Sequence, residues 1–207
     1  MRKIDEIYLS NHENFVMVDN RYYGGNQAWL YTKKLRRKFW ADRSCGVVAL
    51  ANSLIHMSTY KKEFKGIYNY KNLSKDNFIR FTNELYKHTK PAIYGVHTLN
   101  KLNRGLQSFA RQKASNINFK KMSRPKEMDN TIKFIKSGLK NNSPVLMLTW
   151  NTKIKNLKYH WVTITGYYKT LDGKDFIISS NWGKMQTFSL DDWIKYRSCY
   201  KGLIYFY

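Results

Sequence analysis

A change of sequence pattern at Pro144 limits most strongly how this chain can fold. Before Pro144, apolar residues recur at helical spacing in several segments, whereas after it they occur in short β-branched or aromatic runs. Asp172-Gly173 predicts a hairpin turn between two of these runs. The predicted strands are 145–150, 159–168, 176–180, 185–188 and 203–206. A helical half followed by an antiparallel sheet predicts an α+β fold.

The strongest predicted helix runs from Ser44 to about Met57, where Ala and Leu favour a helix and either Asp42 or Ser44 is available as its N-cap. Apolar residues cover most of its sides, which predicts a central position. Three more helices are predicted at 75–87 after a Ser74 cap, 99–113 and 126–140. Residues 1–43 show no sustained period, so we expect an extended arm and loops that wrap the domain.

The length of 207 residues is enough for one sizeable core and too short for two ordinary domains, so 1–207 is predicted to be a single domain. No apolar run approaches the roughly 18 residues that cross a bilayer. The basic start, Met1 to Glu6, is not followed by a hydrophobic segment, so no signal peptide is recognised. We therefore expect a cytoplasmic protein without a transmembrane segment.

The two cysteines, Cys45 and Cys199, do not form a disulfide framework and are predicted to be free thiols. Neither Cys-x-x-Cys nor His-Glu-x-x-His occurs, so no metal and no cofactor are expected. Cys199 lacks any helix-start context and is interpreted as structural.

The charge is strongly basic: 37 Lys and Arg against 14 Asp and Glu give +23, with clusters at 33–38, 61–65, 120–126 and 153–158. Such a charge favours polyanions and acidic substrates. The alternative is a Lys-rich composition that reflects genome base bias, with the charges on solvated faces. No nucleic-acid motif accompanies them.

Cys45-Gly46 stands at the head of the strongest helix, where unpaired N–H groups and the helix dipole stabilise a thiolate. We therefore expect an acidified thiol; the alternative is a buried cysteine that acts as a small hydrophobe. His160 begins a predicted strand and Asn181 ends the next one, so the hairpin brings them together. An Asn oxygen there can orient the imidazole while Trp182 shields the bond from water. Alone, either residue is equally typical of a strand boundary.

Cys-Gly at a helix start, His-Trp-Val-Thr-Ile-Thr-Gly-Tyr on a strand and then Asn-Trp-Gly resemble, in this order, the papain-like cysteine peptidases. Within them, these strings are similar to the branch typified by bacteriocin leader peptidases, which are bacterial. The resemblance implies a helical lobe with the nucleophile helix packed on an antiparallel sheet lobe. It also implies acyl transfer through a thioester, with Cys45 as nucleophile, His160 as general base and Asn181 as the orienting residue.

One departure concerns the oxyanion hole, since the family usually has a Gln about six positions before the cysteine and this chain has Phe39. Gln27, after the Gly24-Gly25 turn, is our candidate for the missing donor beside the Cys45 N–H; the alternative is a loop amide that bonds only backbone or solvent. Bacteriocin leader peptidases commonly precede a transporter, which is not seen here, so the substrate is not inferred from them.

These features predict a cysteine hydrolase, in particular a peptidase (thiol protease), that cleaves an amide or thioester bond of a peptide or acyl substrate. Trp161 and Trp182 are the candidate substrate-binding residues. An acyltransferase or transpeptidase with the same triad stays open, as does a catalytically inactive basic protein that binds polyanions on the same scaffold. An unrelated α+β fold that separates the three residues is a further alternative. The sequence does not indicate an oligomeric state.

Overall fold

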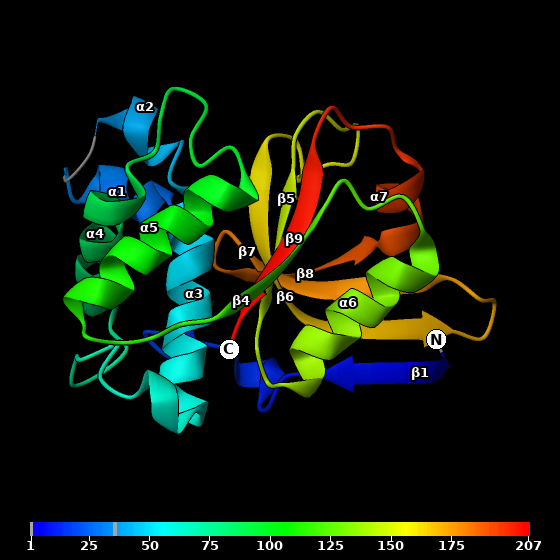
Figure 1. The fold of residues 1–207 in the computed structure, drawn as a ribbon, viewed down its shortest axis with the longest axis horizontal. Coiled ribbons are helices and arrows are strands. Elements are labelled where there is room, and N and C mark those ends of the chain that lie inside the picture. The colour runs from blue at the N-terminus through cyan, green and yellow to red at the C-terminus, as the bar shows by residue number, and fades with distance from the viewer. Residues whose placement is uncertain (1, 35–36) are drawn as a thin grey trace.

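The computed structural model describes residues 2–34 and 37–207. Met1 lies outside the described residues, as do Leu35 and Arg36 of the basic cluster 33–38. Most helices gather on one side of the molecule and the sheet lies on the other (Figure 1). The chain is an α+β fold, as the change of pattern at Pro144 predicted.

The helices of the described chain are α1 (Ala28–Thr32), α2 (Lys38–Ala41), α3 (Cys45–Tyr60), α4 (Lys75–Thr89), α5 (Leu99–Gln112), α6 (Met128–Lys140), α7 (Leu190–Lys195) and the 3-10 turns His12–Asn14 and Lys62–Phe64. The four predicted helices are confirmed to within a few residues. Ser74 caps α4 as expected, because its Oγ accepts the N–H of Asn77 at 3.2 Å. None of the helices in the described ranges combines the length and the apolar character needed to cross a membrane.

The strands pair antiparallel throughout and are β1 (Lys3–Tyr8), β2 (Met17–Val18), β3 (Tyr22–Tyr23), β4 (Phe119–Ser123), β5 (Val145–Thr149), β6 (His160–Thr170), β7 (Asp175–Asn181), β8 (Lys184–Ser189) and β9 (Lys201–Phe206). The described residues form a seven-stranded sheet in the order β4-β9-β5-β6-β7-β8, with β1 paired to β6. β5 covers His160–Ile164 and β1 covers Gly166–Thr170. The two strands therefore follow one another along the same side of β6, opposite β7.

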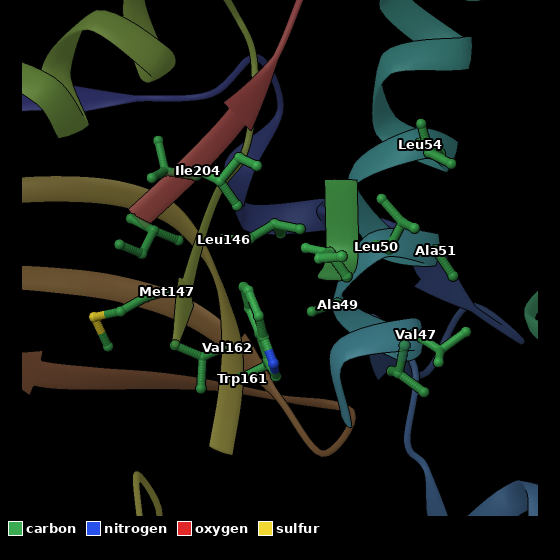
Figure 2. Packing of buried hydrophobic residues seen from close by; sticks show 14 of the residues in the cluster. Val47, Ala49, Leu50, Ala51, Leu54, Leu146, Met147, Trp161, Val162 and Ile204 are labelled. Carbon is green, nitrogen blue, oxygen red and sulfur yellow. The ribbon is translucent and has the colours of Figure 1, made fainter. Parts of the chain in front are cut away.

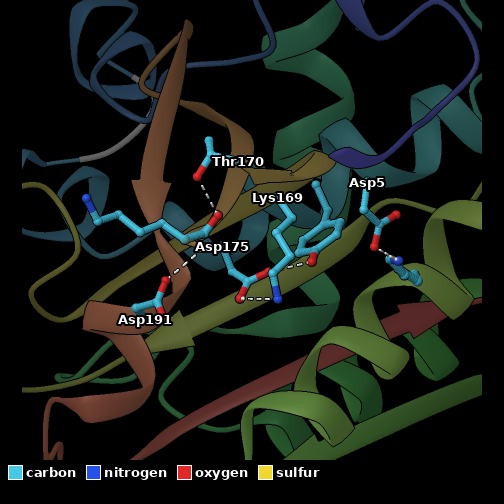
Figure 3. Close-up of polar contacts among 8 residues, drawn as sticks. Asp5, Lys169, Thr170, Asp175 and Asp191 are labelled. Atoms are coloured by element: carbon cyan, nitrogen blue, oxygen red, sulfur yellow. Dashed lines mark hydrogen bonds and ion pairs between the residues drawn. The ribbon is translucent and has the colours of Figure 1, made fainter. Parts of the chain in front are cut away.

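The prediction of an extended arm and loops for residues 1–43 is wrong where regular elements form, which include the short β2–β3 pair and the 3-10 turn His12–Asn14. Residues 3–8 join the sheet as β1, and 28–32 and 38–41 form α1 and α2. β1 carries charged side chains because it lies at the edge of the sheet, where Asp5 pairs with Lys136 of α6 (Figure 3). α1 and α2 are too short to produce a detectable period. β4 and α7 also went unpredicted.

The core lies between α3 and the sheet (Figure 2). Every residue from Cys45 to Met57 is buried, which confirms α3 as a central helix. Val47, Leu50 and Leu54 of α3 belong to this core together with Leu146 and Ile204 of the sheet. Ser44 immediately precedes the helix, but its Oγ donates to the carbonyl of Trp40 at 2.8 Å, so the predicted side-chain N-cap is absent.

The far end of the β6–β7 hairpin is fixed by polar contacts around the buried Asp175 (Figure 3). Its carboxylate accepts the hydroxyl of Tyr167 at 2.5 Å and lies 3.8 Å from the ammonium of Lys169. The backbone N–H of Asp175 donates to Asp191 at 2.8 Å. The predicted turn is present, with Gly173 at φ +79°. These contacts fix β6 and β7 at the end opposite to His160 and Asn181.

Candidate active site

Cys45 lies where two cavities meet. The first measures about 10 Å³ and is also lined by His160 and Asn181, which is near the lower limit for one water molecule. The second is a cleft of about 670 Å³. Cys45 begins α3 and is 8% exposed. Its thiol is therefore shared between a narrow polar site and a space large enough for a ligand.

Gly46, which follows Cys45, lies where there is no room for a side chain. A Cβ at Gly46 would lie 2.8 Å from Cβ of Val96 and 3.0 Å from Nε1 of Trp161. Trp161 is 3% exposed, and its indole N–H donates to the carbonyl of Val96 at 2.5 Å. Trp161 thus lies between the two cavities, and its hydrogen bond connects β6 to the loop 93–97.

His160 and Asn181 meet as the hairpin predicted, with Nε2 of His160 2.7 Å from Oδ1 of Asn181. Nδ2 of Asn181 donates to the backbone carbonyl of Asn156 at 3.4 Å and to Oε1 of Gln186 at 3.1 Å. Since a carbonyl only accepts, these bonds assign Oδ1 as the atom that faces the imidazole. Nε2 therefore carries the proton, and Nδ1 keeps a free lone pair.

The sequence did not point to Gln186. It lies on β8 opposite Ser179 and holds the amide of Asn181 from the side away from His160. Its only signal is its position a few residues after Asn181 across a tight turn, which is not distinctive.

Trp182 lies beside the imidazole of His160, with ring centres 4.5 Å apart at 39°. It occupies the left-handed region at φ +48°, and its carbonyl accepts Nδ2 of Asn26 at 3.2 Å. Trp182 lines the small cavity, whereas Trp161 lines both spaces. Trp182 is thus placed to keep water from the bond between His160 and Asn181.

Burial keeps both Cys45 and His160 in their uncharged forms near neutral pH. It raises the pKa of the Cys45 thiol to about 11, although backbone hydrogen bonds from Trp161 and Gly46 oppose the shift. It lowers the pKa of His160 to about 4, against the effect of the bond to Asn181. The expectation of an acidified thiol is therefore wrong. The helix dipole stabilises a thiolate by about 0.3–1 kcal/mol, less than the roughly 3 kcal/mol by which burial disfavours it.

Gln27, the residue directly before α1, lines the small cavity. Its Nε2 donates to the backbone carbonyl of Asp42 at 3.1 Å. Its Oε1 is buried and has no hydrogen-bond partner among the described residues. The Gly24-Gly25 turn, with Gly24 at φ +77°, leads the loop here. A primary amide nitrogen has two N–H groups, and the Asp42 carbonyl engages one of them.

A buried network connects the three segments of the site. Oδ1 of Asn52, on α3, accepts the N–H of Gly25 at 2.9 Å, and its Nδ2 donates to Oγ of Ser180 at 3.3 Å. Ser180 in turn donates to the carbonyl of Tyr23 at 2.7 Å. The helix of Cys45, the loop of Gln27 and the strand of Asn181 therefore share one set of hydrogen bonds, which the sequence did not reveal.

The cleft lies between the loop 93–97 and the strand ends of the sheet. Its walls are mainly apolar and aromatic, formed by Ile93, Tyr94, Leu148, Trp150 and Trp161. Cys199 also lines it and is an exposed free thiol, as predicted, so this cysteine does not pack in the core. It lies in an irregular segment after α7, and no local sequence pattern indicated that this segment is near Cys45.

No group of three or more His, Cys, Asp and Glu side chains suited to a metal ion occurs within residues 2–34 and 37–207. No model of a known protein family matches the chain, and no curated protein matches it either. The geometry of the site is therefore what indicates a function for this chain.

Proposed function

We propose that this chain is a cysteine hydrolase of the papain-like class and acts as a peptidase on amide bonds. The observation that carries the proposal is the 2.7 Å bond between His160 and Asn181 in a cavity that Cys45, at the start of α3, also lines. The papain-like assignment is further supported by a nucleophile helix on one side, a base and its orienting residue on the sheet, and a cleft beside them.

In the proposed reaction, Nδ1 of His160 takes the proton of the Cys45 thiol as Sγ forms a bond to the substrate carbonyl carbon. His160 then gives this proton to the leaving amine as the C–N bond breaks, which leaves a thioester on Cys45. Water attacks the thioester carbonyl as Nδ1 of His160 accepts its proton, and His160 then gives this proton to Sγ as the C–S bond breaks, which returns the Cys45 thiol. Asn181 accepts the Nε2–H of His160 throughout, so that Nδ1 is the atom that takes and gives the proton in each step.

Oxyanion stabilisation is assigned to the backbone N–H of Cys45 and the second N–H of Gln27. Gln27 suits this role because it lies at the same cavity and because Asp42 fixes its amide. Phe39, at the position where the family usually has its Gln, is exposed.

The pKa values favour general-base attack over a preformed ion pair. With the thiol near 11 and the imidazole near 4, both groups are neutral at pH 7 before substrate arrives. Proton transfer then accompanies attack, when the developing charges stabilise each other in a site with little water.

Two alternatives use the same scaffold. An amine in place of water would make the chain an acyltransferase or transpeptidase, with the same residues in the same roles. A basic binding protein without turnover is favoured by one observation, the raised pKa of Cys45. A thiol that stays protonated is a poor nucleophile.

Alkylation of Cys45 by iodoacetamide tests the proposal. The rate is measured by mass spectrometry across pH 5–9 in the intact protein, His160→Ala and Asn181→Ala, all in a Cys199→Ser background. We expect modification at neutral pH to fall at least about tenfold without His160, and to fall less without Asn181. The exposed Cys199, followed in Cys45→Ser protein, is the control that His160→Ala leaves unchanged. Equal rates at Cys45 with and without His160 would favour the binding protein.

A further inference from the structure

The loops beside the cleft carry charge of one sign. The loop 150–159 starts and ends at the cleft residues Trp150 and Tyr159, and the segment 195–200 contains the cleft residue Cys199. The backbone N–H of Trp150 donates to the backbone carbonyl of Tyr200 at 2.9 Å, so the two segments are neighbours. Their exposed basic residues, which we call the basic rim, are Lys153, Lys155, Lys158, Lys195 and Arg197.

The basic rim has no anionic partner of its own. Neither segment contains Asp or Glu, and no ion pair between described residues involves a member of the rim. The carboxylate that lines the cleft, Asp42, is paired with Lys38 at 2.9 Å. Unpaired like charges around a concave site raise the local positive potential, which an anionic ligand would relieve.

The lining of the cleft is suited to an apolar ligand group. Ile93 and Tyr94 are 62% and 83% exposed at its edge, although the walls behind them are aliphatic and aromatic. Exposed apolar residues gathered around a hollow are typical of a binding site. At about 670 Å³ the cleft can hold one large side chain together with its backbone.

We propose that the site takes a peptide segment in which one large apolar or aromatic residue is flanked by Asp or Glu. The apolar side chain occupies the cleft beside Cys45, and the flanking carboxylates face the basic rim. This inference rests on the proposed function, and it names the substrate class of that site. A polynucleotide matches the charge of the rim, but it offers no amide carbonyl chain to a thiol and is therefore the comparison ligand of the test.

The test measures binding without turnover, using Cys45→Ser protein and fluorescence anisotropy. The probes are a labelled peptide with Phe amid Glu residues, the same peptide with Ala for Phe, a version with Lys for Glu, and an oligothymidylate of matched charge. We expect the Phe and Glu peptide to bind at least about tenfold more tightly than the other three, and to weaken as ionic strength rises.

Two triple variants with the same change in net charge locate the contact. Lys153→Glu, Lys155→Glu and Lys158→Glu reverse the rim, whereas Lys71→Glu, Lys133→Glu and Lys140→Glu reverse exposed lysines of a loop and of α6 away from the cleft residues. The rim triple is expected to lose about tenfold or more in affinity, and the control triple less than about threefold. Circular dichroism checks that both triples are folded.

Equal losses in both triples, tighter binding of the oligothymidylate, or no effect of the central Phe would each overturn the inference. The proposed function is judged separately by alkylation of Cys45. Dependence of alkylation on His160 without selective peptide binding would retain the hydrolase and reject this substrate class. Selective peptide binding without that dependence would retain the acidic-peptide site and reject hydrolysis.

Discussion

Asn52 follows Cys45 by seven residues on α3, so its amide lies two helical turns below the thiol on the same face. The same side chain holds Gly25 and Ser180. The helix of Cys45, the proposed nucleophile, is therefore connected to the loop of Gln27 and the strand of Asn181 through Asn52. Asn52 itself takes no part in the proposed reaction.

Replacing Asn52 with Leu is expected to lower the free energy of unfolding by about 1–3 kcal/mol, because the buried N–H of Gly25 loses its acceptor. Urea unfolding measures this loss, and iodoacetamide alkylation of Cys45 should slow in the folded variant. Thr82→Val is the matched control, since the buried hydroxyl of Thr82 bonds only within α4. Equal effects of the two variants would show that Asn52 has no special part in aligning the site.

Gln186→Leu is expected to loosen Asn181, because Nδ2 of Asn181 loses its acceptor at 3.1 Å. The rate of Cys45 alkylation at neutral pH should fall about three- to tenfold, less than in Asn181→Ala, while the bond to Asn156 remains. Thr187→Val, at an exposed neighbour on β8, should leave the rate unchanged. An unchanged rate in Gln186→Leu would remove this residue from the site.

Acid should destabilise the fold through two buried histidines. Burial lowers the pKa of His56 and of His160 to about 4. The unfolded chain therefore binds more protons than the folded one between pH 6.5 and 4, and stability falls as pH falls through this window. Each histidine adds a slope of up to about 1.4 kcal/mol per pH unit. Urea unfolding at several pH values measures the slope.

His56→Gln isolates one of these contributions, because Gln can keep the contact with Asn142 without titrating. Between pH 6.5 and 4, the unfolding free energy of this variant should change less steeply with pH than that of the intact protein, because one of the two titrating histidines is gone. His160→Gln should show the same reduction. Carboxylates contribute equally to all three proteins. Parallel pH profiles of the intact protein and both variants would contradict this prediction.

Gly46→Ala should destabilise the protein by about 1–3 kcal/mol through overpacking against Val96 and Trp161. Helix propensity alone predicts the opposite sign, a gain of about 1 kcal/mol for Ala over Gly inside a helix. Thermal unfolding therefore decides between the two effects. A raised midpoint would mean that the loop 93–97 yields to the added methyl group.

The features that could be predicted from the sequence are those that follow from long periodic segments and from the order of motifs along the chain. The apolar helix after Ser44 is strongly patterned, and a hairpin places its two ends together whatever the rest of the sheet does. This is why the contact between His160 and Asn181 could be foreseen from Asp172-Gly173. The helical half, the antiparallel sheet and the main helix bounds followed from the same signals.

Other parts of the site depend on distant partners and leave no local pattern. Gln186 and Asn52 look like ordinary polar residues until the sheet and α3 are packed together. β1 has charged residues at a sheet edge, so its sequence lacks an apolar alternation. The raised pKa of Cys45 reflects its burial in the folded chain, whereas the sequence showed only the favourable helix start.

The bond from Trp161 to the carbonyl of Val96 joins the sheet to the loop that forms the opposite wall of the cleft. Opening the cleft would break this bond and expose an indole that is now almost completely buried. In the proposed hydrolase, the distance between the walls is thereby set in advance. Such an enzyme would choose its substrates by conformation as well as by composition, and would accept chains that arrive already extended, such as unstructured tails and linkers, in preference to segments held inside a folded domain.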